Sequence, residues 1–284
     1  MDRITLSFGR HGSKKDIPAL RSQLEGHQVF VDDSIMTPEN RIRAIKAVNS
    51  NMEGVRRKMA RGYVLAQLGQ EYNDGIIEAL VPIPGMRYFI VEEYCPEKLK
   101  EINELQASRD SKIDDIFRFA VSSYRVNDAL SAAFSYLRDY EAYIRARNAG
   151  IKEGFRRMPG EIREIFGMNS MQVFARFGST HGALADDLRT EGLKVDVVSN
   201  EVNFTSEIVQ RMTGRDRFVM TEEDGIRALY ALLYSGYSGD ESKERLVFSQ
   251  LGREIGFINF LDAVAGTRDA GKRIASAFGA APGA

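Results

Sequence analysis

The stretch from Met171 to Val198, MQVFARFGSTHGALADDLRTEGLKVDVV, decides the fold of this chain. Its first residues, 171–177, are mostly apolar, as in a buried strand, and they stop at a Gly-Ser-Thr-His turn. Apolar residues then recur at helical spacing from 183 to 193, and a second strand is expected at 195–198. In a strand-turn-helix-strand unit, ligands usually bind at the carboxyl end of the first strand. We therefore expect His181, in the turn, to stand at a binding site.

The amino terminus has the same pattern. Residues 4–8 alternate between apolar and polar, a Gly-Arg-His-Gly turn follows, and a helix is expected from about Asp16 to Leu24 before a second apolar run. His11 therefore falls at nearly the same place in its unit as His181 does in the other. The third histidine of the chain, His27, is expected to be a surface residue.

Composition limits the class of protein. The chain has 284 residues, of which 43% are hydrophobic, enough to bury a substantial core. Lys plus Arg (39) nearly balances Asp plus Glu (40), so no global field favours nucleic acid or an anionic membrane as a partner. The single cysteine, Cys95, excludes an intramolecular disulfide and a zinc site built from cysteines. The first residues lack the apolar segment of a signal peptide, and we expect a cytoplasmic protein without membrane spans.

The remaining pattern predicts long helices between the strands. One helical region is expected from Thr37 to about Tyr72, with a possible joint near Gly54, and another from Pro96 to about Met158, where Pro159-Gly160 breaks it. Further strands are expected at 88–91 and 217–220. We predict a single α/β domain over residues 1–265, with a central, mostly parallel sheet of about five strands and large helical insertions. A flexible tail is expected at 266–284.

Acid pairs follow two of the predicted strands, Asp32 with Asp33 and Glu92 with Glu93. Because the carboxyl ends of parallel strands meet at one edge of a sheet, we expect these acids to converge with His11 and His181. Paired histidines can act as base and acid, and a carboxylate within hydrogen-bond reach orients an imidazole. Arg10 could hold an anionic group of a substrate.

The same histidines, acids and arginines also have purely structural explanations. A histidine after a strand can be a satisfied polar residue, and acids at strand ends are often solvated or cap a helix. Arg145, Arg147 and Asn148 are expected to form a solvated helix face unless they turn inward. Histidines and acids can bind zinc or iron, but the chain has no HExxH or HxH spacing, so we predict no metal and no other cofactor.

The chain from about residue 4 to 198 resembles the erythromycin esterase-like and Tiki/TraB superfamily. Its members share a histidine after the first strand, an acid after the second, a helical Arg/Asn segment and a later GxxH motif. The matching pieces here are SFGRHGSKKD, VFVDD, YFIVEEY, YIRARNAGI and FARFGSTHGALADDLRTEG.

This resemblance implies a hydrolase in which His11 and His181 are the paired catalytic histidines. Asp32 or Asp33 would stand where the family has its strand-end glutamate. The family usually carries another glutamate, in a GE-containing motif before the first histidine, where this chain has Phe-Gly-Arg. Either another acid such as Glu92 substitutes, or the protein binds a ligand without that chemistry. The residues expected to bind a small-molecule or peptide substrate are Arg10, Asp33, Glu93, Asn148, Ser179 and Thr180.

Two alternatives remain open. The triplet Arg10-His11-Gly12 resembles the histidine phosphatase superfamily, which implies a phosphoryl group on His11, phosphate bound by Arg10, Arg61 and His181, and Glu92 or Glu93 as the acid. That fold needs a strand before the second arginine, whereas 46–61 is expected to be one helix, which favours the esterase-like reading. The other alternative is a non-catalytic ligand-binding or interaction protein on the same scaffold.

Overall fold

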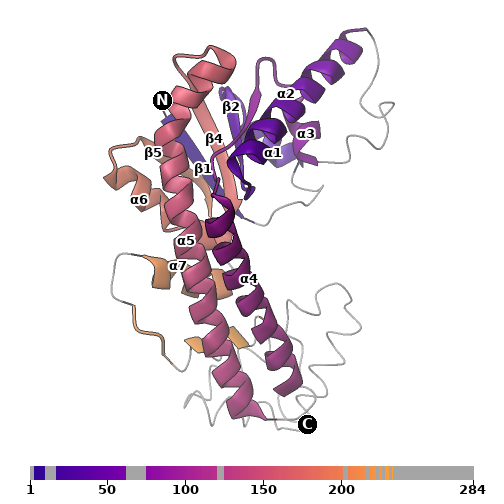
Figure 1. The fold of residues 1–284 in the computed structure, drawn as a ribbon. Helices are drawn as coiled ribbons and strands as arrows, with labels where there is room; N and C mark the ends of the chain where they lie inside the picture. Colours follow the sequence, from indigo (N-terminus) through magenta and orange to yellow (C-terminus); the bar gives the residue numbers. More distant parts are fainter. Residues whose placement is uncertain are drawn as a thin grey trace. The chain divides into compact units, whose positions relative to one another are not determined.

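The structure is a computed structural model that describes most of the first 200 residues and short parts beyond them (Figure 1). The described residues are 3–9, 17–61, 75–119, 125–200, 204–214, 218–221, 224, 225, 228, 229 and 232. Arg10, His11 and the tail expected at 266–284 lie outside these ranges. The chain divides into two compact units, Met1–Ile102 with Ile144–Val202 and Asn103–Tyr143 with Asn203–Ala284, and each is described by itself.

A five-stranded parallel sheet forms the centre of the first unit (Figure 1). The strands are β1 (Arg3–Gly9), β2 (Val29–Asp32), β3 (Arg87–Ile90), β4 (Gln172–Gly178) and β5 (Val195–Asn200). Their order across the sheet is β3-β2-β4-β1-β5. The predicted α/β fold, with a parallel sheet and helical insertions, is therefore confirmed. Because β4 lies between β2 and β1, the turn after β4 leaves the sheet between the ends of these two strands.

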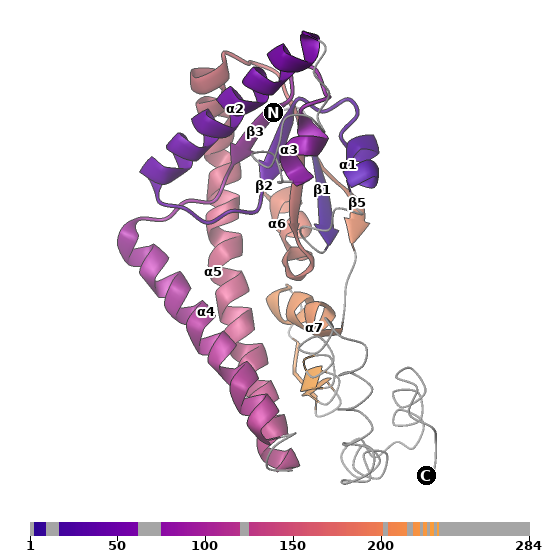
Figure 2. The same ribbon diagram turned by 90° about the vertical axis from the view of Figure 1, so that its right-hand side faces the viewer.

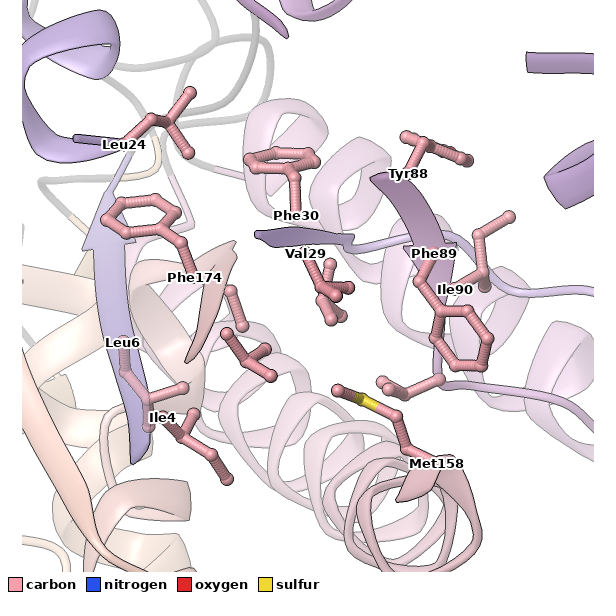
Figure 3. Packing of buried hydrophobic residues seen from close by; sticks show 14 of the residues in the cluster. Ile4, Leu6, Leu24, Val29, Phe30, Tyr88, Phe89, Ile90, Met158 and Phe174 are labelled. Atoms are coloured by element: carbon pink, nitrogen blue, oxygen red, sulfur yellow. The ribbon is translucent and has the colours of Figure 1, made fainter. Parts of the chain in front are cut away.

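The sheet is buried on both faces, which explains the nearly continuous apolar runs of its strands. Phe30 of β2 stands between Phe174 of β4 and Tyr88 of β3 on one face, with ring centroids 6.3 and 6.4 Å from its own. Figure 3 shows that Leu6 and Met158 lie on the opposite side of the sheet. Successive side chains of a strand point to opposite faces, so both faces carry part of one hydrophobic core.

The helices are α1 (Ile17–Gln23), α2 (Pro38–Ala60), α3 (Gly75–Leu80), α4 (Pro96–Phe117), α5 (Val126–Phe166), α6 (Leu184–Thr190) and α7 (Phe204–Thr213). A short 3-10 turn, η5 (Ser179–His181), follows β4. α1 and α3 lie side by side (Figure 2), where Arg21 donates a hydrogen bond to the Glu78 carbonyl at 3.1 Å. In the part of the chain that the structure describes, no helix is both long and apolar enough to cross a membrane.

Two predictions of secondary structure were wrong. α5 continues through Pro159, where a break was expected, whereas α2 runs through Gly54 as a single helix, one of the two expected arrangements. Phe155 and Met158 before the proline and Ile162 after it are all fully buried, so packing holds the helix across it. The expected strand at 217–220 is absent from its described residues, 218–220.

Helix α2 covers the outer edge of β3. The Asn49 side chain donates a hydrogen bond to the Tyr88 carbonyl at 2.8 Å and accepts one from the Tyr88 N–H at 3.0 Å. About two helical turns before Asn49, Arg41 donates a hydrogen bond to the Ile90 carbonyl at 2.9 Å. These side chains supply the partners that a further strand would offer, which stabilises an edge strand against pairing with another chain.

Helix α5 approaches the end of β3 more closely than a side chain would allow. A Cβ atom at Gly154 would overlap the backbone carbonyl of Val91, directly after β3. A Cβ at Gly150, one turn earlier, would overlap the ring of Tyr94. Two glycines four residues apart therefore let the helix lie against the segment that follows β3.

Gly154→Ala should lower the free energy of unfolding by about 1–3 kcal/mol, because the added methyl group meets backbone that cannot rotate away. Gly160→Ala is the matched control on the same helix, since a Cβ there meets nothing within 4 Å. It should be neutral or stabilising by up to about 1 kcal/mol. Urea unfolding of both variants checks this, and equal effects would show that the close approach is not tight.

His27 is partly buried, not a free surface residue as predicted. Its Nε2 lies 2.8 Å from the Thr5 hydroxyl, and its ring meets Phe174 edge-on at 5.4 Å between centroids. Burial lowers the pKa of His27 below its usual value, with hydrogen bonds to the backbone of Leu24 and Glu25 opposing the shift. Folding therefore favours the neutral imidazole.

The depressed pKa predicts a pH dependence of stability. The contribution of His27 is fully present above its unfolded pKa of about 6.5 and is lost as the pH falls through the lower folded pKa. His27→Gln should therefore flatten the decline of the unfolding free energy on the acidic side of neutrality. Denaturant unfolding across this range measures it, and an unchanged slope would contradict the assignment.

Candidate functional site

Polar side chains gather where β2, β3 and β4 end. Asp33 directly follows β2, Glu92 is the second residue after β3, and η5 after β4 ends with His181. Since β2 pairs with both β3 and β4, and all three strands are parallel, these ends are neighbours at one edge of the sheet. The carboxyl edge of a parallel sheet is the usual place for a ligand site.

Arg147 of α5 joins two of these carboxylates in what we call the carboxylate–arginine cluster (Asp33, Glu92 and Arg147). Its Nε donates to the two oxygens of Glu92 at 3.0 and 3.2 Å, and its Nη2 donates to Glu92 Oε2 at 2.6 Å and also to Asp33 Oδ1. Asp33 Oδ2 accepts the backbone N–H of Gly178 at 3.0 Å. The cluster therefore ties α5 to the ends of β2, β3 and β4.

The cluster is almost closed to solvent. The side chains of Arg147, Asp33 and Glu92 are 9%, 6% and 1% exposed. Burial raises the pKa of the Glu92 carboxyl; hydrogen bonds and charge from Arg147 oppose this rise, and the nearby charge of Asp33 adds to it. Two carboxylates share one guanidinium, so the cluster carries a net negative charge if both are ionised. Protonation of Glu92 would make it neutral.

His181 is held by the residue next to Arg147. Its Nδ1 lies 2.6 Å from Asn148 Oδ1, and both residues are buried, at 1% and 6% exposure. An amide oxygen only accepts hydrogen bonds, so Nδ1 carries the hydrogen, and in the neutral imidazole Nε2 then keeps its lone pair. The ring is further confined by Phe177, at 6.0 Å between centroids. This arrangement fixes both the orientation and the tautomer of a potential base.

The face of α5 that carries these residues continues a buried stripe. Ile151 and Phe155, both fully buried, follow Arg147 at intervals of four, so the three side chains lie on one face of the helix. The expectation that Arg147 and Asn148 form a solvated face was therefore wrong. Their phase with the apolar residues was the signal that could have placed them inward. Arg145, two residues away, is exposed.

The structure brings only some of the predicted site residues together. Asp33 and Glu92 meet through Arg147, whereas Asp32 turns the other way and accepts hydrogen bonds from Tyr88 at 2.7 Å and Ser34 at 2.8 Å. Successive residues of an extended chain point to opposite sides, which separates the two aspartates.

The two glutamates after β3 diverge in the same way. Glu93 pairs with Arg41 of α2 and, at 2.9 Å, with Arg157 of α5. Arg41 is itself buried and also pairs with Glu161 at 2.9 Å. Glu93 therefore belongs to an ion-pair network that fastens α2 to α5, separate from the partners of Glu92.

The remaining predicted residues lie at the turn or beyond the described ranges. Ser179 and Thr180 form η5 with His181, and Thr180 is buried at 6% exposure. Arg10 and His11 fall outside the described residues. Within the ranges that are described, no three His, Cys, Asp or Glu side chains are grouped to hold a metal ion.

Removing the guanidinium of Arg147 should destabilise the folded protein. Arg147→Ala removes the guanidinium that bonds two buried carboxylates, which should lower the free energy of unfolding by about 3–5 kcal/mol near neutral pH. The loss should shrink in acid, where the carboxylates bind protons and need no cation.

Arg145→Ala is the matched control, because it deletes the same group from an exposed position two residues away on the same helix. It should change stability by less than about 0.5 kcal/mol. Denaturant unfolding at two pH values measures both variants. Equal losses, or a loss for Arg147→Ala that is independent of pH, would contradict the role given to the cluster.

Comparisons of the chain with protein-family models, curated proteins and solved structures found no match. Conclusions about function therefore rest on the side chains at the carboxyl edge of the sheet. His181 with Asn148 and the adjacent carboxylate–arginine cluster form the candidate functional site.

Proposed function

We propose that this protein is a hydrolase for uncharged esters or amides, with a paired-histidine site of the erythromycin esterase-like and Tiki type. The observation that carries the proposal is the buried His181–Asn148 hydrogen bond of 2.6 Å beside the carboxylate–arginine cluster. An oriented imidazole of defined tautomer, next to a group that can change its protonation, is the minimum equipment for general acid–base hydrolysis.

In this mechanism His181 acts as the general base. Its Nε2 takes a proton from water while the water oxygen adds to the acyl carbon of the substrate. The imidazolium that forms is stabilised by its Nδ1–H bond to Asn148. The bond from the acyl carbon to the leaving oxygen or nitrogen then breaks, and the imidazolium returns its proton to that atom. The net reaction adds one water molecule across the acyl bond.

The second histidine of the proposed pair is His11. β1 ends at Gly9, whose register partner in β4 is Gly178, so the chain leaves the two strands at neighbouring positions. His11 follows Gly9 by two residues and His181 follows Gly178 by three. This parallel between the two strand ends supports the paired-histidine proposal.

The described residues favour this function over a phosphatase. Arg147, the buried arginine of the site, is already engaged by two carboxylates, whose charge opposes the approach of a phosphate dianion. Arg61, expected to bind phosphate in the alternative, follows the end of α2 and is exposed. Arg56, one turn before it, bonds carbonyls of the segment that precedes β3, such as Met86. Arg61 thus belongs to the amino end of the sheet.

Hydrolysis of p-nitrophenyl acetate and p-nitrophenyl phosphate tests the proposal. The wild type should cleave the ester and leave the phosphate intact. His181→Ala should lower kcat/KM for the ester by about 100- to 10,000-fold, the usual contribution of general acid–base catalysis. Asn148→Ala should lower it less, because the imidazole remains but loses its orientation. His27→Gln, which changes a histidine near the amino ends of the strands, is the control and should retain activity.

Each contrary result has a definite meaning. Full ester hydrolysis by His181→Ala would overturn the proposed role of this histidine. Cleavage of the phosphate with an acid-labile phosphoenzyme at His11 would favour the phosphatase alternative. If the protein hydrolyses neither compound, and a small molecule copurifies with the wild type but not with His181→Ala, the protein is a binding protein instead.

A further inference from the structure

Tyr94, four residues after the end of β3, contacts the carboxylate–arginine cluster. Its hydroxyl lies 2.7 Å from Glu92 Oε1 and 3.4 Å from the backbone carbonyls of both Ala146 and Arg147. The residue is 7% exposed. One hydroxyl therefore lies within reach of a buried carboxylate and of two carbonyls of α5.

The position of this hydroxyl is fixed from two sides. The backbone N–H of Tyr94 donates to the Met36 carbonyl at 2.9 Å, and Met36 also forms a parallel bridge with Glu93. The phenol ring lies over Gly150, where a Cβ atom would overlap it. The close approach of α5 thus leaves a space that the tyrosine ring fills, and the ring directs its hydroxyl to Glu92.

Both protonation states of Glu92 have partners in this arrangement. When Glu92 is ionised, it accepts hydrogen bonds from Arg147 and from the Tyr94 hydroxyl. When Glu92 is protonated, its own O–H can donate to the tyrosine oxygen, and the tyrosine hydrogen can turn to the carbonyl of Ala146 or Arg147. In both states the Glu92 carboxyl and the Tyr94 hydroxyl have hydrogen-bond partners, which avoids the cost of a buried polar group that has none.

We propose that Tyr94 is the positioning residue that lets Glu92 take up and release a proton inside the buried cluster. Among the residues that the structure describes, the charged and titratable groups that face Glu92 are Arg147 from α5, Asp33 from the end of β2, and Tyr94 itself. One proton moves onto or off a carboxylate oxygen of Glu92, and no covalent bond to Tyr94 forms. The kinetic test of this role rests on the proposed hydrolase function. The protonation of Glu92 itself can be followed without a substrate.

The direction of the effect follows from the hydrogen bond. The Tyr94 hydroxyl stabilises ionised Glu92 and holds its pKa below the value that burial alone would give. Tyr94→Phe keeps the ring over Gly150 and removes only the hydroxyl. The pKa of Glu92 should therefore rise further in this variant.

Infrared difference spectra between each protein and its Glu92→Gln counterpart follow the protonated carboxyl of Glu92 across pH. Tyr94→Phe should move the titration midpoint to higher pH. Tyr88→Phe is the matched control, because Tyr88 is also 7% exposed and donates to a carboxylate, Asp32, at the same 2.7 Å. It should leave the midpoint unchanged. An unchanged midpoint in Tyr94→Phe, or an equal shift in both variants, would overturn the proposal.

Kinetics separate a positioning role from a merely structural one. Tyr94→Phe should lower ester hydrolysis on the order of tenfold and move the acidic limb of the pH–rate profile to higher pH. In a Glu92→Gln background the same change should have no further effect, because Tyr94 acts through Glu92. An equal loss in both backgrounds would overturn the positioning role. If the wild type hydrolyses no ester, the proposed function fails, while the infrared titration still decides the role of Tyr94.

Discussion

The site depends on one arginine that lies between two buried carboxylates. Charges are costly to remove from water, and among the described residues Arg147 is the cation that bonds the buried Glu92 carboxylate. The same guanidinium bonds Asp33, so it fixes the ends of β2 and β3 relative to α5. Asn148, the next residue of the helix, then reaches His181. The orientation of the histidine is therefore a consequence of how the helix is anchored by its neighbour.

That anchoring requires a helix that can come close to the sheet. Gly154 admits the carbonyl of Val91, and Gly150 admits the ring of Tyr94, so both the helix backbone and the tyrosine reach positions that larger residues would block. Residues that lie far apart in the chain thus meet without a long loop. The site is held by a regular helix and three strand ends, which are more rigid supports than loops.

Most of the fold could be predicted from the sequence, but less of the candidate site could. The alternation in β1 and the strand-turn-helix-strand pattern around His181 depend on local spacing, and both were predicted correctly. The apolar spacing of α5 marks the face of Arg147 as buried, but its partners could not be predicted, because the tertiary packing of this 41-residue helix decides which strand ends lie opposite that face. The choice between Asp32 and Asp33 depends on where β2 ends relative to its neighbours, a difference of one residue that reverses the side chain's direction.

The hydrogen bonds of Asn49 have a consequence for the behaviour of the protein at high concentration. A primary amide can present its carbonyl and one of its two N–H groups in nearly the same geometry as a peptide group, so Asn49 bonds Tyr88 as a neighbouring strand would. A second chain that paired with the edge of β3 would first have to displace helix α2 and the hydrogen bonds between Asn49 and Tyr88. An apolar residue of the same size at position 49 would leave the Tyr88 N–H and carbonyl without these two hydrogen bonds.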